Sequence, residues 1–132
     1  MNFQKTIIIE PESLLQEIEV LGDNLIILTG RSQTYIYNFR TGLCHSEFNT
    51  DDLNTIRCVV ALDNGNFILS GANNIIREYN TSGTPIREVK TDQTIINKHI
   101  LLLAYQQLSA RNCFTPCMQA EVAEPERISF GF

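Results

Sequence analysis

Short apolar stretches separated by turn residues occupy the chain from residue 14 to residue 90. The stretches are four to seven residues long, and residues such as Gly, Asn, Asp, Ser and Thr stand between them. This spacing is typical of antiparallel strands joined by short turns. We expect eight strands in two groups of four: 16–21, 25–29, 34–39 and 43–49, then 56–62, 66–70, 75–80 and 85–90.

The strands differ in how polar residues are distributed along them. Residues 25–28 and 58–62 are continuous apolar runs, which suit strands that are buried on both faces. Residues 16–21 alternate between polar and apolar, so one face of this sheet should differ from the other. We expect two sets: Ile18, Val20 and Ile36 on one face, and Glu19, Tyr35 and Tyr37 on the opposite face.

The two groups of strands are copies of one unit. Leu28-Thr29-Gly30 recurs as Leu69-Ser70-Gly71, 41 positions later, and Gly42 has the same offset from Gly83. Between these glycines the match slips by one residue, which a hairpin loop tolerates. A repeat of about 40–45 residues has the length of a four-stranded propeller blade. We therefore predict two blade-like repeats, at 14–49 and 55–90.

The second copy carries a resemblance to a known family. Residues 56–83 (IRCVVALDNGNFILSGANNIIREYNTSG) resemble a WD-repeat blade, and the same region is similar to an NHL-repeat blade. An apolar strand is followed by an Asn64-Gly65 hairpin turn, then by Leu69-Ser70-Gly71, and Tyr79-Asn80 stands where the family has Trp-Asp. The resemblance implies propeller-type blades and a role in binding other molecules.

The chain also departs from the WD-repeat pattern. It contains no Trp and no Gly-His pair. In the family's buried hydrogen-bonding set only the Ser/Thr position is matched, by Thr29 and Ser70, so this set is incomplete here. Complete propellers have about four to eight blades, and this chain has two. The exposed blade faces could be covered by oligomerisation into a ring, by docking on another propeller, or by packing of the two sheets as a sandwich. Residues 5–9 predict one more strand, in the fourth-strand position of a preceding unit or at a local sheet edge.

The pattern changes after residue 90. Thr91-Asp92 offers a helix cap, and residues 94–111 predict a helix with apolar residues on more than one side. We expect this helix to pack on two sides and to cover the face that a third blade would cover, or else to bind a partner. The fold class is therefore mainly β, with two four-stranded antiparallel propeller-type blades, an N-terminal strand and a C-terminal helix. Residues 1–112 form one β domain, and 113–132 form an acidic, partly flexible tail.

Charge and hydropathy exclude some partners. Ten Lys and Arg against fifteen Asp and Glu give a net charge of −5, without a basic cluster, so nucleic acid is disfavoured. The apolar run 100–105 is too short to cross a membrane. The first ten residues lack the apolar region of a signal peptide, which favours a cytoplasmic protein. The acidic C-terminus is also similar to the translocation signals of type IV secretion effectors, so export into a host cytosol is the alternative.

Few residues offer chemistry. Cys113 and Cys117 are separated by three residues, but Cys44-His45 is the sole candidate second pair for zinc, and neighbouring strand residues point to opposite faces. A thiolate nucleophile would need a base such as His45 or His99 beside it. We expect no catalytic residue, no metal and no cofactor.

These patterns favour a non-enzymatic protein–protein interaction or scaffold module, with another protein or its own copy as the partner. The alternatives are a sugar-binding protein whose ring closes by oligomerisation, an enzyme that uses Cys113 or Cys117, and a small effector or regulator that acts by binding another protein. Polar turns between the strands should present the binding residues. The candidates are Arg31, Gln33, Asp51, Asp52, Asn73 and Asn74.

Overall fold

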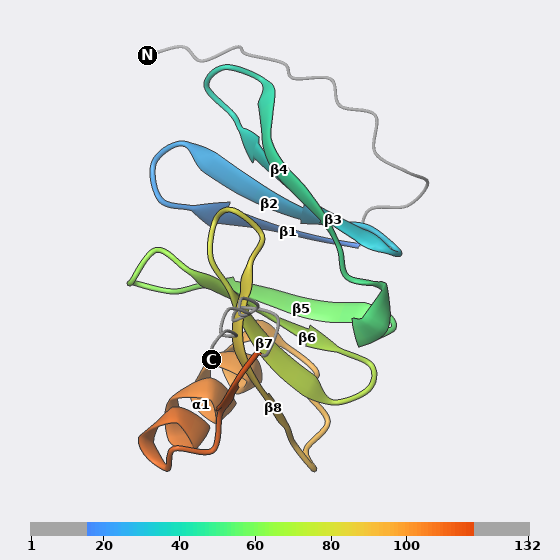
Figure 1. Ribbon diagram of the computed structural model, residues 1–132, viewed down its shortest axis with the longest axis vertical. Coiled ribbons are helices and arrows are strands. Elements are labelled where there is room, and N and C mark those ends of the chain that lie inside the picture. The colour runs from blue at the N-terminus through green and yellow to red at the C-terminus, as the bar shows by residue number, and fades with distance from the viewer. Residues whose placement is uncertain (1–15, 118–132) are drawn as a thin grey trace, which may run out of the picture.

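The computed structural model describes residues 16–117, in which the eight predicted strands form two antiparallel sheets (Figure 1). Each strand boundary lies within one residue of its predicted position. Sheet A has the order β1-β2-β3-β4 and sheet B the order β5-β6-β7-β8-β9. The elements of sheet A are β1 (Glu17–Leu21), β2 (Leu25–Thr29), β3 (Gln33–Asn38) and β4 (Leu43–Asn49). They are followed by η1 (Asp51–Leu53), β5 (Ile56–Ala61), β6 (Phe67–Gly71), β7 (Ile75–Tyr79), β8 (Pro85–Lys90), α1 (Lys98–Ala110) and β9 (Thr115–Pro116).

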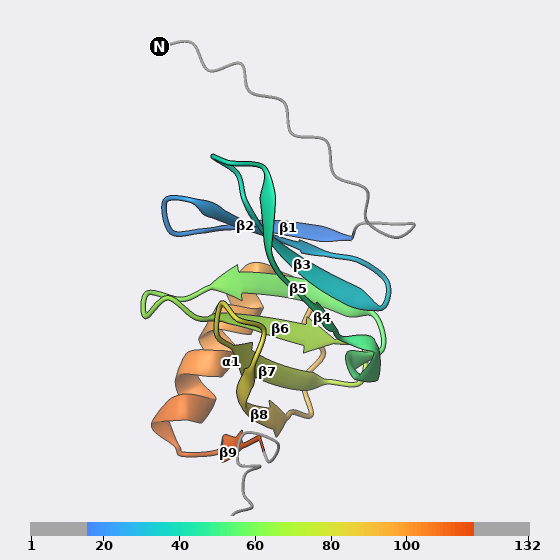
Figure 2. The same cartoon turned by 45° about the horizontal axis from the view of Figure 1, so that its top comes forward.

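The two sheets and the helix form three layers, with sheet B in the middle (Figures 1 and 2). The core between the sheets is built around Ile27, Ile36, Phe67 and Leu69, which are fully buried. A second core lies between sheet B and α1 and includes Ile68, Ile76, Ile95 and Leu101. The mainly β fold is therefore confirmed. Residues 5–9 lie outside the described part of the chain.

The register within sheet A corrects the predicted assignment of its two faces. Val20 pairs with Ile26, and Ile26 pairs with Tyr37, so these three side chains share one face. Ile36 pairs with Ile27 and lies on the opposite face, in the core between the sheets. Alternation within one strand does not decide how the next strand is aligned with it, because the intervening turn sets that register.

The helix covers sheet B, as expected, but it begins later and packs differently. Asn97 is its N-cap, with Oδ1 accepting a hydrogen bond from the backbone N–H of Ile100 at 2.9 Å, so the predicted cap at Thr91-Asp92 is wrong. The Thr91 hydroxyl oxygen instead accepts a hydrogen bond from the N–H of Gln93. Leu101 is buried while Leu103 is 54% exposed. The helix therefore packs on one side, and the expectation of packing on two sides is wrong.

The short strand β9 returns the chain to the edge of sheet B after the helix. It pairs with Arg87 and Glu88 of β8, and the N–H of Cys117 donates to the carbonyl oxygen of Ile86 at 3.0 Å. The residues of β9 and Cys117 belong to the segment that the sequence analysis assigns to the acidic tail. β9, the fifth strand of sheet B, was therefore not predicted.

Candidate functional site: an exposed apolar face on sheet A

The surface of sheet A that points away from sheet B is apolar, and we call it the outer face. It carries side chains from the first three strands, in cross-strand pairs that the register defines: Ile18, Leu28 and Tyr35, then Val20, Ile26 and Tyr37. Ile18 and Val20 are 57% and 58% exposed, among the most exposed large hydrophobic residues of the described chain. Leu28 and Tyr35 on the same face are only 3% and 6% exposed, so the exposed apolar area of the outer face lies mainly on β1.

The 41-residue repeat shows what type of surface this is. Ile18, Ile26 and Leu28 are the equivalents of Val59, Phe67 and Leu69 in sheet B. These three residues of sheet B are fully buried in the core between the sheets, because sheet A covers them. The outer face of sheet A is therefore equivalent to a face that, in sheet B, lies against another sheet.

Polar groups of the first strand lie on the side of sheet A that points towards sheet B. The Glu19 carboxylate accepts a hydrogen bond from the N–H of Ala61 at 3.0 Å. Its other oxygen pairs with Nζ of Lys98 at 2.6 Å, at the start of α1. Glu19 thus links all three layers at their margin, while its neighbours Ile18 and Val20 point outwards.

Two tyrosines extend the outer face across β3. The rings of Tyr35 and Tyr37 lie 6.4 Å apart, centre to centre, and Tyr35 is buried while Tyr37 is half-buried. Burial raises the pKa of the Tyr37 phenol, and the acidic groups of Cys44 and Glu47 raise it further. The Tyr37 phenol therefore contributes uncharged surface at neutral pH. The Glu47 carboxylate on β4 lies beside Tyr35 in register.

The predicted binding residues lie on three turns that meet at one side of the molecule, at the right in Figure 1. The Asn73 side-chain amide donates to the carbonyl oxygen of Asp52 at 2.9 Å, and Asp52 also pairs with Nη1 of Arg77 at 3.0 Å. Arg31 and Asp51 are exposed, and Gln33 and Asn74 are half-buried. The structure brings the turns together and uses Asp52 and Asn73 in internal bonds, while their role in binding stays a prediction.

Two of the cysteines singled out in the sequence have raised thiol pKa values. Burial and the neighbouring Glu88 raise the pKa of Cys117, and burial and Glu47 raise that of Cys44, so both thiols are protonated at neutral pH. His45 and His99 are exposed on different elements. Within residues 16–117, no three His, Cys, Asp or Glu side chains are grouped as a metal site would require.

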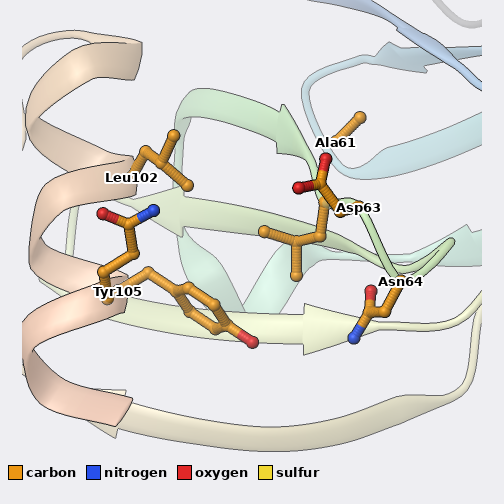
Figure 3. A pocket seen from close by; sticks show the side chains of 7 residues that line it. Ala61, Asp63, Asn64, Leu102 and Tyr105 are labelled. Carbon is orange, nitrogen blue, oxygen red and sulfur yellow. The ribbon is translucent and has the colours of Figure 1, made fainter. Parts of the chain in front are cut away.

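A hollow of about 300 Å³ lies between α1 and the turn that joins β5 to β6 (Figure 3). Leu102 and Tyr105 line it from the helix, and Asp63 and Asn64 line it from the turn. The Tyr105 hydroxyl donates to Glu78 at 2.8 Å and accepts from Arg87 at 2.8 Å. This hydroxyl is therefore already bonded within the protein.

No protein-family model matches this sequence, and the search of curated proteins finds no match to it. The resemblance to WD-repeat and NHL-repeat blades therefore stays a prediction. Among the described residues, no helix has the length and apolar character that crossing a membrane requires.

Sequence reasoning missed the outer face because it placed Ile18 and Val20 on the face of Ile36 instead of that of Tyr35 and Tyr37. A usable signal was present in the repeat. Glu17 and Glu19 stand where the second copy has Cys58 and Val60, whereas the positions of Ile18 and Val20 are apolar in both copies. Comparing the copies position by position separates the face that changed from the face that stayed apolar.

Proposed function

We propose that this protein is a non-enzymatic interaction module that binds another protein through the outer face of sheet A. The observation that carries the proposal is the exposure of Ile18 and Val20 on a face whose repeat equivalent lies buried under a sheet. The partner surface that fits is an apolar, twisted antiparallel sheet, because sheet B meets sheet A in that way.

Covering the exposed aliphatic side chains of this face would contribute favourable free energy to binding. Burying a Val or Ile side chain completely contributes about 1.5–3 kcal/mol. Ile18 and Val20 are a little more than half exposed, so covering both would contribute roughly 2–3 kcal/mol. A half-buried tyrosine at the centre of the face, Tyr37, is a residue type that often dominates binding energy.

Site-specific photo-cross-linking tests the proposal in cells. A photoreactive residue is placed at Val20 or, as a matched control, at Leu103, which is similarly exposed on α1. We expect cross-linked protein at position 20 and little at position 103. Ile18→Glu should abolish the cross-links made from position 20, because a carboxylate on the covered face would lose its water.

Cross-links that are equal at both positions, or that survive Ile18→Glu, would contradict the proposal. The predicted turns are tested in the same way, with a photoreactive residue at Arg31 or at Asp51. Cross-links from the turns alone would move the binding surface from the sheet face to the turns.

A further inference from the structure

We propose that the free edge of β4 binds an extended segment of a partner protein, which joins sheet A as a fifth strand and places a basic residue opposite Glu47. This edge is distinct from the outer face, so the inference goes beyond the proposed function and can fail separately. β4 is the edge strand of sheet A, and within residues 16–117 it pairs with β3 alone (Figure 1). Five of its seven residues are exposed, so no described element covers it.

The hydrogen bonds at the end of β4 show which backbone groups point away from the sheet. The N–H of Thr50 donates to the carbonyl oxygen of Ser32 at 2.9 Å, so position 50 is bonded in the direction of β3. Bonded positions alternate along an antiparallel strand, and the N–H and carbonyl groups of Glu47 and Asn49 therefore point to the free edge. Among the described residues, no turn or loop backbone bonds to these groups. They form a template on which another strand can pair.

Sheet B shows an added strand at the equivalent edge. β8 is the repeat counterpart of β4, and Glu88 stands 41 positions after Glu47. β9 pairs with β8 at this point, where Glu88 is opposite Thr115 and the N–H of Cys117 donates to the carbonyl oxygen of Ile86 at 3.0 Å. Both strands have a register shift at the same point of the repeat, and β8 binds β9 in spite of it. The backbone of β4 therefore has the form that accepts an extended segment in sheet B.

Glu47 determines the chemistry of the segment that fits. In sheet B, Glu88 lies opposite Arg77, and Arg77 Nε donates to its carboxylate at 2.6 Å. In sheet A, the residue opposite Glu47 is Tyr35, and Glu47 forms no ion pair with another described residue. Oppositely charged side chains directly across two strands stabilise their pairing. A Lys or Arg opposite Glu47 on the added strand would supply the missing charge.

The topology favours a separate molecule over other occupants of this edge. β1 begins at Glu17 on the opposite edge of sheet A, roughly three strand spacings or about 14 Å from β4. Strand directions alternate across the sheet, so an antiparallel fifth strand would run in the direction of β1. A preceding segment of the same chain would have to cross the sheet and return along its length before entering β1. β4 of a second copy contains no Lys or Arg to place opposite Glu47.

Amide hydrogen exchange, measured by NMR on the full chain, tests the edge with a defined probe, the capped peptide acetyl-TVKVT-amide. Its lysine can lie opposite Glu47, and its valines then share the face of Phe48. In the free chain, the N–H groups of Glu47 and Asn49 should exchange faster than that of Phe48, which is bonded towards β3. With peptide at about five times its dissociation constant, about one molecule in six is free, so the two edge amides should exchange about sixfold more slowly.

Control peptides separate charge from backbone pairing. Acetyl-TVEVT-amide should bind about two- to fivefold more weakly than the lysine peptide, and Glu47→Lys should reverse that preference. A lysine peptide that is N-methylated at the lysine lacks the N–H that would donate to the edge, so it should bind at least threefold more weakly, by about one lost hydrogen bond. Ile18→Glu on the outer face should leave the affinity for the lysine peptide unchanged, which keeps this test separate from that of the proposed function.

Several results would overturn the inference. Edge amides of the free chain that exchange as slowly as that of Phe48 would show an occupied edge; exposure of these amides by removal of residues 1–15 would identify that segment as the occupant, and exposure by dilution would identify a second copy. Lysine and glutamate peptides of equal affinity would show that Glu47 selects nothing. An absence of protection up to about 10 mM lysine peptide would show that the edge does not accept an extended segment.

Discussion

Replacing Glu78 by alanine should lower the free energy of unfolding by about 3 kcal/mol. The Glu78 side chain is 2% exposed on β7, between sheet B and α1. Its carboxylate accepts hydrogen bonds from Asn66 Nδ2 at 2.7 Å, from Arg87 Nε at 2.9 Å and from the Tyr105 hydroxyl at 2.8 Å. This one group therefore links the β5–β6 turn, β8 and the helix.

The magnitude follows from the partners that lose their acceptor. Removing one member of a buried ion pair costs about 3–5 kcal/mol, because the other charge is left without compensation. The Arg87 side chain is 35% exposed and can recover some water, which places the expected loss at the lower end. Its guanidinium also lies 4.8 Å from the centre of the Phe114 ring, a contact that the substitution leaves in place.

The pH dependence provides an independent measurement. Burial alone would raise the pKa of Glu78, but the hydrogen bonds from Asn66, Arg87 and Tyr105 outweigh it and hold the pKa below the ordinary value of 4.5. A carboxyl group whose pKa is lower in the folded state contributes stability above pH 4.5, and loses that contribution as the pH falls through the folded-state pKa. The stability difference between the wild type and Glu78→Ala should therefore narrow below pH 4.5.

Urea unfolding followed by circular dichroism at pH 7, 5, 4 and 3 measures both effects. Glu78→Gln keeps one oxygen acceptor and should lose about half as much stability as Glu78→Ala. Glu47→Ala, an exposed carboxylate on β4, is the matched control and should change stability by less than about 0.5 kcal/mol. A loss below 1 kcal/mol for Glu78→Ala, or a difference that stays constant down to pH 3, would refute the reasoning.

Two further predictions concern packing and thiol access. Gly71→Ala should cost about 2–3 kcal/mol in urea unfolding, because the new Cβ would overlap the Leu53 carbonyl oxygen of η1. Gly22→Ala, at φ +67° with open space around it, should cost about 1 kcal/mol; equal losses would show that η1 yields to the methyl group. With Ellman's reagent at pH 8, exposed Cys113 should react first and buried Cys58, whose pKa burial raises, should react only as the protein unfolds. A Cys58 that reacts as fast as Cys113 in the folded protein would contradict the packing described for β5.

The strands were predictable because each turn has its own chemistry. Asn64-Gly65 predicts a tight hairpin, and Gly65 has a φ of +92°. Gly42 and Gly83 also have positive φ values at equivalent turns, so the repeat located the same boundary twice. Local residues decide such boundaries, and a single sequence contains them in full.

The features that the sequence did not reveal depend on contacts between distant segments. The strand β9 has two residues, one of them proline, and forms because α1 delivers it to the edge of β8. The start of α1 was misplaced because Thr91-Asp92 and Asn97 are all good N-caps, and the packing of Ile95 against sheet B selects the later one. The candidate face depended on the register between strands, which alternation within one strand does not determine.

Comparison of β1 with β5 gives the strongest physical reason to expect a cover on the outer face. A strand with one face in water normally places its polar residues on that face and its apolar residues inside. β5 is apolar on both faces, because sheet A covers one and α1 covers the other. β1 shows the reverse of the usual arrangement, because its polar Glu19 lies on the inner side, towards sheet B, while its apolar Ile18 and Val20 point outwards. Glu19 is compensated by the Ala61 N–H and by Lys98, but no described contact explains why the outward residues should be aliphatic. A protein surface over Ile18 and Val20 would account for that polarity, and the comparison of cross-links from positions 20 and 103 tests whether a partner supplies it.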